Sequence, residues 1–148
     1  MLTKKEAFNA LKLEIEQKEA RIQSAFDDLN SAVTDDSKST AGDKHETGRA
    51  MVHLEQEKLS SQLAQVKLLK EALAQINIEE KHTKIQFGSL VTTNKGVFFF
   101  SIGLGKIKVN GEDVFCLTVT TPLGKALFGK KVGDKVMFNS EVKIESID

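Results

Sequence analysis

The sequence has little of several features that would assign it to a common class of protein. It contains one cysteine, one proline, and neither tryptophan nor tyrosine. The single cysteine, Cys116, cannot form a disulfide within the chain. No apolar run approaches the roughly 20 residues that a membrane-spanning helix needs, and the N-terminal residues lack the apolar stretch of a secretory signal. These absences favour a soluble protein of the cytoplasm.

The residue patterns of several functional sites are absent as well. Gly103-Leu104-Gly105 lacks the glycine spacing and the following helix of a nucleotide-binding loop. We find no nucleophile–base arrangement, and no pattern of aromatic and basic residues that would bind RNA independently. The sequence therefore gives no support to an enzyme that acts on its own.

The net charge of zero hides two oppositely charged halves. Residues 1–80 carry 11 Lys and Arg against 15 Asp and Glu, a net of −4, whereas residues 81–148 carry 10 against 6, a net of +4. The acidic excess is concentrated in residues 27–46, where six carboxylates stand against two lysines. Such a concentration usually marks a solvated surface, and less often a site for a partner or a metal ion.

Apolar residues in the first half repeat every seven positions, which is typical of a coiled coil. The first run is Phe8, Ile15, Ile22 and Leu29, with Leu11, Ala25 and Ala32 at the companion position. The second run is Val52, Leu59, Val66 and Leu73. Between the runs, residues 34–42 have the composition of a turn. We expect residues 5–35 and 47–78 to form an antiparallel helical hairpin with arms about 45 Å long.

The second half changes to the short apolar runs of a β-sheet. The expected strands cover residues 85–93, 97–104, 106–109, 114–119, 136–138 and 142–144. Asn110-Gly111 lies between two of these runs and predicts a tight hairpin turn. Pro122 precedes an expected short helix over residues 123–128. We expect Cys116 to pack in the core of the sheet, and Phe98–Phe100 to fill the core on both sides of it.

Asp43 and Glu46 lie where the hairpin must turn. Two carboxylates at the end of a helical arm suggest a protein that delivers negative charge into a partner. The same spacing is that of a capping box, with Asp43 as the N-cap of the second helix and Glu46 reaching back to its amide. The two roles are compatible, because a cap could fix the geometry that metal binding uses. His45 between them is interpreted as an exposed residue rather than a metal ligand.

A run near the C-terminus resembles a signature of the Gre transcript-cleavage factors (GreA/GreB). The run reads Thr121-Pro122-Leu123-Gly124-Lys125-Ala126-Leu127-Phe128-Gly129-Lys130-Lys131-Val132-Gly133-Asp134-Lys135-Val136. In that family, a Ser/Thr-Pro-x-Gly-x-Ala-Leu-x-Gly-Lys-x-x-Gly-Asp run lies in the C-terminal domain. Residues 85–91 resemble the strand that opens the same domain, and Gly42-Asp43-x-x-Glu46 resembles the tip loop of the family. The resemblance thus covers the whole architecture.

The resemblance implies a fold and a function. The fold is α+β, with an N-terminal antiparallel coiled-coil hairpin in residues 1–80, an acidic tip near residues 35–46, and a small FKBP-like antiparallel sheet domain with a short helix in residues 81–148. The function is that of a monomeric transcription elongation factor that binds bacterial RNA polymerase through its secondary channel and meets the nascent RNA 3′ end only within that complex. By this interpretation the chain is not an enzyme and has no cofactor of its own, and it stimulates the cleavage of backtracked RNA by the polymerase itself.

The resemblance also implies roles for individual residues. Asp43 and Glu46 would assist the binding of a Mg²⁺ ion shared with the polymerase active site, since Mg²⁺ prefers oxygen ligands and is typically held by one or two carboxylates. The C-terminal domain would hold the rim of the channel while the hairpin passes down it. Its expected partner-binding residues are Pro122, Gly124, Lys125, Lys130, Lys131 and Asp134.

The tip departs from the family pattern directly after the acidic pair. The family usually continues with Asn, Ala, an acidic residue and Tyr, whereas this chain has Thr47-Gly48-Arg49-Ala50. An inhibitory channel binder of the same architecture is therefore an alternative. Outside this family, the alternatives are an FKBP-like isomerase or chaperone and a coiled-coil interaction protein whose acidic tip is a solubilising cap.

Overall fold

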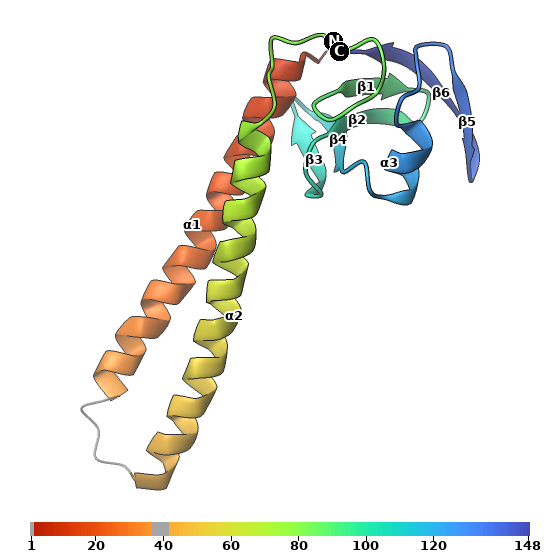
Figure 1. Ribbon diagram of the computed structural model, residues 1–148. Coiled ribbons are helices and arrows are strands. Elements are labelled where there is room, and N and C mark those ends of the chain that lie inside the picture. The colour runs from red at the N-terminus through yellow and green to blue at the C-terminus, as the bar shows by residue number, and fades with distance from the viewer. Residues whose placement is uncertain (1, 37–41) are drawn as a thin grey trace. The chain divides into compact units, whose positions relative to one another are not determined.

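Two helices come first in the chain, and a six-stranded sheet with one short helix follows (Figure 1). This element order confirms the α+β class. The computed structural model describes the backbone of residues 2–36 and 42–148 and the side chains of residues 2–32 and 48–148. The chain forms two compact units, one of Ile15–Leu69 and one of Met1–Glu14 together with Lys70–Asp148. The beginning of the first helix and the end of the second thus group with the sheet, and the expected domain boundary near residue 80 stays a prediction.

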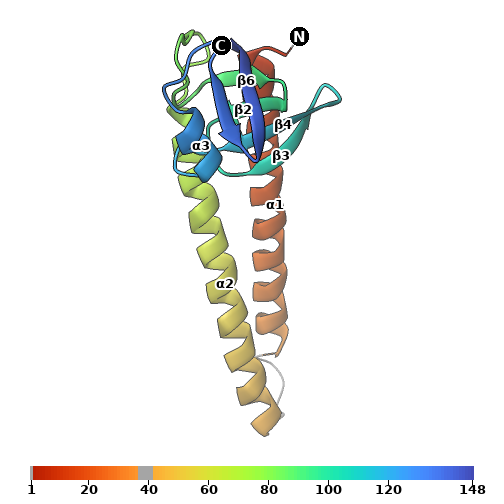
Figure 2. The same ribbon diagram turned by 90° about the vertical axis from the view of Figure 1, so that its right-hand side faces the viewer.

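Helices α1 (Lys4–Asp36) and α2 (Gly42–Ala74) have 33 residues each and run side by side in opposite directions (Figures 1 and 2). At 1.5 Å per residue, each helix is about 50 Å long. A capping box begins α1: the Glu6 N–H donates to Thr3 Oγ1 at 3.1 Å, and the Thr3 hydroxyl donates to Glu6 Oε1 at 3.0 Å. None of the helices in the described part of the chain is long and apolar enough to cross a membrane.

The seven-residue apolar repeat supplies the buried seam of the hairpin, as predicted. Its buried members are Ile15, Ile22, Leu59, Val66 and Leu73, with Leu11 buried at the companion position. Phe8, Leu29 and Val52 are only half-buried. Ala25 and Ala32 are exposed, so the prediction that they line the seam is wrong. A single methyl group does not reach far enough to be covered where the larger seam residues nearby are themselves half-buried.

A polar contact joins the two helices beside the half-buried part of the seam. Gln56 Nε2 donates to Asn30 Oδ1 at 2.7 Å. A hydrogen bond between side chains typically contributes about 0.5–1.5 kcal/mol. The contact therefore supports the pairing of α1 with α2 where apolar burial is weakest.

The strands follow the order β3-β4-β2-β1-β6-β5 across the sheet. They are β1 (Leu90–Thr93), β2 (Gly96–Phe100), β3 (Gly105–Val109), β4 (Glu112–Leu117), β5 (Lys135–Phe138) and β6 (Ser140–Ile147). Neighbouring strands are antiparallel except β2 and β4, which are parallel. After β2 the chain reverses direction and forms β3 at the sheet edge, and a hairpin then returns it as β4 beside β2. Because the chain has reversed twice, β4 runs in the same direction as β2. The expected antiparallel sheet is therefore mostly, not wholly, antiparallel.

Two turns decide where strands begin. Asn110 and Gly111 have φ values of 51° and 83°, as the two central residues of a type I′ hairpin turn require, and this confirms the predicted hairpin. Gly88 has a φ of 92°, and the Ser89 N–H donates to the Gln86 carbonyl oxygen at 3.0 Å. This second turn interrupts the first expected strand, so β1 begins at Leu90 instead of residue 85.

One core of the sheet lies beside the short helix α3 (Pro122–Leu127). It consists of the buried residues Ile85, Val91, Phe98, Phe100, Leu127, Val142 and Ile144. Side chains alternate along a strand, so Phe99 projects to the face opposite Phe98 and Phe100. Phe99 is fully buried too. The prediction that these three phenylalanines pack on both sides of the sheet is thus confirmed.

We predict that Gly48→Ala stabilises the protein. Gly48 lies within α2 and is exposed, and a Cβ atom added there would meet nothing within 4 Å. Replacing an exposed helical glycine by alanine removes backbone freedom from the unfolded chain, which is worth about 0.5–1 kcal/mol. Urea unfolding followed by circular dichroism should show this gain in the free energy of unfolding.

Gly124→Ala is the matched control for this experiment. In α3 the same added methyl group would overlap the carbonyl oxygen of Thr118, so this variant should lose stability. A Gly48→Ala protein that is less stable than the wild type would show that α2 does not continue through this position.

Candidate functional site

The acidic pair expected to carry function lies at the start of α2. The helix begins at Gly42, so Asp43 and Glu46 are both within its first two turns. Residues three apart are neighbours on a helix surface. The side chains of this pair and of His45 lie outside the described residues, so their assigned roles stay predictions.

The start of α2 bears on the alternative capping role. A capping box needs Asp43 at the position just before the helix, whereas Gly42 and Asp43 are both helical. Negative charge near a helix N-terminus is still favourable, because the backbone amides there carry partial positive charge. The backbone therefore accommodates the acidic pair well without using Asp43 as the residue before the helix.

Two further acidic residues of this region lie on α1. Asp27 and Asp28 have exposed side chains, and Asp27 accepts a hydrogen bond from Gln23 Nε2 at 3.0 Å. On α2, the residues Gly48–Ala50 that follow the acidic pair are also exposed. The described part of the hairpin next to the turn is thus solvated on both helices.

The motif run in the sheet domain builds a capped helix. Thr121 is the N-cap of α3, because its Oγ1 accepts from the Gly124 N–H at 3.1 Å and donates to the Thr118 carbonyl oxygen at 2.9 Å. Pro122 follows at the first helical position, where its missing N–H is not needed. Gly124 is buried against the Thr118 backbone and leaves no room for a side chain. Local structure explains these residue types, and a role of Pro122 and Gly124 in partner binding stays a prediction.

A closed turn follows α3. The Lys131 N–H donates to Asp134 Oδ2 at 2.8 Å, and the Asp134 N–H donates to the Lys131 carbonyl oxygen at 3.0 Å. Gly133 has a φ of 92°, which glycine adopts without strain. Lys125, Lys130 and Lys131 are exposed. The expected binding lysines are thus accessible to a partner, whereas the carboxylate of Asp134 is engaged in its own turn.

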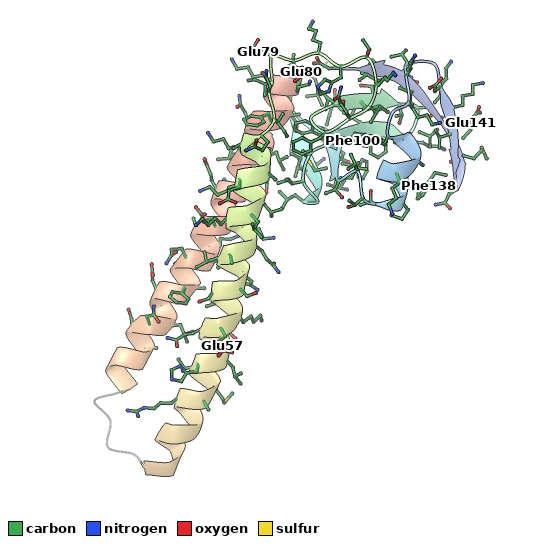
Figure 3. All side chains as sticks on the ribbon, in the orientation of Figure 1. Glu57, Glu79, Glu80, Phe100, Phe138 and Glu141 are labelled. Carbon is green, nitrogen blue, oxygen red and sulfur yellow. The ribbon has the colours of Figure 1, made fainter. Side chains whose placement is uncertain are left out.

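A buried polar network is present that the sequence did not indicate. Lys4, in the first turn of α1, is only 1% exposed, and its Nζ donates to the carbonyl oxygen of Glu80 at 2.5 Å. His82 is buried as well: its Nδ1 shares a hydrogen bond of 2.7 Å with Ser89 Oγ, and its Nε2 lies 3.6 Å from Glu80 Oε1 (Figure 3 labels Glu80). No local pattern could have found this network, because lysine is almost never fully buried and the partners are far apart in sequence.

Ser89, His82 and Glu80 have the residue types of a hydrolytic triad but not its accessibility. Ser89 is fully buried, and its Oγ already accepts from the Gln86 N–H at 3.0 Å. A nucleophilic serine must reach the carbonyl carbon of a substrate. The arrangement therefore holds the segment before β1 in place rather than performing catalysis.

Burial shifts the pKa of three groups. Desolvation lowers the pKa of Lys4, against the attraction of the Asp148 and Glu80 carboxylates. Desolvation also lowers the pKa of His82, and the nearby charge of Lys4 acts in the same direction. Cys116 is buried, as predicted, and this burial raises the pKa of its thiol to about 12. The thiol is therefore protonated and unreactive at neutral pH.

Within the described residues, no group of three or more His, Cys, Asp or Glu side chains is placed to hold a metal ion.

No protein-family model and no characterised protein matches the sequence. Two similar solved structures are GreA factor homolog 1 (Gfh1) of Thermus thermophilus and a structure of the transcription factor Gfh1. The first has 16% identity over 95% of this chain and 94% of that chain, with a TM-score of 0.35. The second has 19% identity over 99% and 95%, also with a TM-score of 0.35.

We predict that acidification destabilises the protein through His82. Its pKa is lowered in the folded state from the ordinary value of 6.5, so below that value the unfolded chain binds the proton more readily. The free energy of unfolding therefore falls as the pH decreases from 6.5 towards the folded-state pKa. One such group contributes at most about 1.4 kcal/mol for each pH unit. Urea unfolding at about pH 7.5 and about pH 5.5 measures this loss.

His82→Gln is the control, because glutamine is polar but does not titrate. Between the two pH values this variant should lose less stability than the wild type. Equal losses in the two proteins would show that His82 is not the source of the pH dependence.

Proposed function

We propose that this chain is a Gre-type transcription elongation factor. It binds bacterial RNA polymerase through the secondary channel and stimulates the polymerase's own cleavage of backtracked RNA. The observation that carries the proposal is that one chain combines an acidic pair in the first turns of a long helix with the motif run Thr121–Val136. In this proposal the protein acts as a monomer in the cytoplasm, without a cofactor of its own.

The length of the hairpin supports the proposal. Two helices of 33 residues each can carry charge about 50 Å along a narrow channel. The seam residues Ile22, Leu59 and Val66 are buried, so the two helices support each other. A single unsupported helix would expose these side chains to water and would be only marginally stable.

The chemistry of the tip follows from its carboxylates. Asp43 and Glu46 supply oxygen ligands and negative charge, which are what Mg²⁺ prefers. The ion, shared with the polymerase, supplies the Lewis-acid chemistry of RNA hydrolysis. The helical backbone from Gly42 onward sets the spacing of the two residues, and the partial positive charge of the helix N-terminus offsets part of their mutual repulsion. Because the polymerase performs the hydrolysis, the chain itself is not an enzyme.

The sheet domain supplies the proposed docking surface. Lys125, Lys130 and Lys131 are exposed on a backbone that the Thr121 cap and the Asp134 turn hold in place. A preorganised backbone lowers the entropic cost of binding. The excess of 10 lysines over 6 acidic residues in residues 81–148 favours association with a negatively charged partner surface.

The test of this proposal separates charge from helix stability at the tip. Asp43→Asn and Glu46→Gln each remove a negative charge and change the side-chain volume little. Each variant should bind polymerase but lose most cleavage stimulation, and the double variant should lose little more, because the two carboxylates act as a unit. The measurement is the release of short labelled RNAs from a stalled, 3′-labelled elongation complex with Mg²⁺.

Asp28→Asn is the matched control, since it removes one exposed carboxylate from α1 near the same end of the hairpin. It should retain full cleavage stimulation. Full stimulation by the Asp43→Asn and Glu46→Gln variants would remove the tip from the mechanism. If the wild-type protein slows RNA synthesis and releases no short RNA, the inhibitory channel binder is the better description.

A further inference from the structure

Strand β5 is the last strand of the sheet order, so one of its two edges is open. It pairs with β6 on one side and with no other strand in the described part of the chain. The backbone N–H and C=O groups along such an edge can pair with an added strand. The side chains on and around this edge determine which added strand would fit.

The outer face of the β5–β6 ribbon combines positive charge with an exposed apolar side chain. Lys135 and Met137 alternate with Val136 and Phe138, which pack against the core, and Met137 is 75% exposed. Lys135 lies directly opposite Lys143 of β6. Like charges directly opposite each other destabilise a sheet, so this pair needs a compensating interaction.

Only part of that compensation comes from the protein. Lys135 Nζ forms an ion pair with Glu141 Oε1 at 3.4 Å (Figure 3 labels Glu141), whereas Lys143 forms no ion pair with the residues that the structure describes. A second opposed pair, Lys84 and Lys131, meets in an isolated antiparallel bridge. Neither of these two lysines has an ion-pair partner among the described residues.

One lysine of each pair, Lys131 and Lys135, lies close to the other in the chain. The closed turn from Lys131 to Asp134 leads directly into Lys135. We call Lys84, Lys131, Lys135 and Lys143 the lysine cluster. Positive charge that is only partly compensated is thus concentrated on β5 and on the segments that adjoin it.

The opposite edge of the sheet provides a contrast. Strand β3 carries Lys106 and Lys108, and both approach the carboxylate of Asp113, at 3.9 Å and 3.4 Å. Both lysines of that edge therefore have a carboxylate partner, although they share it. Lysines on an edge strand also prevent association between copies of the same protein. That effect accounts for Lys135, but it does not account for Lys84, Lys131 and Lys143, which all lie outside β5.

We propose that the open edge of β5 and the lysine cluster bind an extended acidic segment of a partner protein by strand addition. Main-chain hydrogen bonds to β5 would provide the affinity, and alternate side chains would provide the specificity. Carboxylates of the segment would face Lys135 directly, the charge of Lys143 on the next strand would add to the attraction, and an apolar side chain would cover Met137. The inference goes beyond the proposed function, because it needs only the partner's extended acidic chain and no polymerase.

A protein segment fits this surface better than a nucleic acid does. A phosphate backbone cannot continue a β-sheet, and it gains nothing from the exposed Met137. Residues 81–148 also contain no arginine, the residue best suited to bidentate phosphate contacts. The positive charge of the lysine cluster repels the same edge of a second copy of the chain and attracts an acidic segment. The same lysines would therefore prevent self-association and bind the partner.

The test uses the full chain and labelled peptides of about eight residues, somewhat longer than a typical strand. The acidic probe alternates Glu and Val, and a basic control probe alternates Lys and Val. A third probe has the acidic sequence with alternate backbone nitrogens methylated, which keeps every charge but removes hydrogen-bond donors. Fluorescence anisotropy at about 0.1 M salt should show binding of the acidic probe and little binding of the other two.

Two matched variants locate the site. Lys135→Gln with Lys143→Gln should weaken binding of the acidic probe about tenfold, whereas Lys106→Gln with Lys108→Gln removes the same charge from the other edge and should change it less than about twofold. Equal losses in the two variants would reduce the effect to net charge and overturn the proposal. The proposal also fails if the acidic probe does not bind, if the methylated probe binds equally well, or if a labelled RNA oligonucleotide binds more tightly than the acidic peptide.

Discussion

Burial of Leu127 and Ile85 in one apolar cluster holds most of the candidate docking surface in place. Both side chains are fully buried, and the backbone pairs around them: the Gly129 N–H donates to the Ile85 carbonyl oxygen at 2.8 Å, and the Ile85 N–H donates to the Lys130 carbonyl oxygen at 2.9 Å. The segment after α3 is thereby tied to the segment before β1. A polar side chain at either buried position would lack water and a partner, at a cost of about 1–3 kcal/mol or more, and the exposed lysines beside it would lose their fixed backbone.

The buried lysine near the N-terminus acts on a different part of the same unit. Lys4 joins the first turn of α1 to the carbonyl oxygen of Glu80, and the Asp148 carboxylate is close enough to attract it. The neighbouring Glu6 accepts a hydrogen bond from Asn110 Nδ2 at the β3–β4 turn. A buried charge contributes less stability than an apolar residue of similar size would. The charge of Lys4 instead favours one arrangement of the chain, because it requires specific polar partners from segments that are distant in sequence.

Features that depend on neighbouring residues were predictable from the sequence, and features that depend on distant contacts were not. The type I′ turn follows from Asn110-Gly111 alone, because asparagine followed by glycine readily adopts two successive positive φ values. The parallel pairing of β2 with β4 depends on which strand reaches the sheet edge first, and no local pattern contains that information. The same distinction holds for the candidate sites. The motif from Thr121 to Asp134 is continuous in the chain and could be recognised, whereas the opposition of Lys135 and Lys143 exists only through the register of β5 and β6.

The seven-residue repeat of the hairpin makes its reach adjustable in fixed steps. The unit Ile15–Leu69 is inserted between Met1–Glu14 and Lys70–Asp148, which form the other unit. Removing seven residues from each helix would shorten the hairpin by about 10 Å, and every remaining seam residue would still face the seam, because a seven-residue step returns to the same side. The length of such a hairpin can therefore change in steps of seven residues for each helix, while the sequence that folds the sheet stays the same.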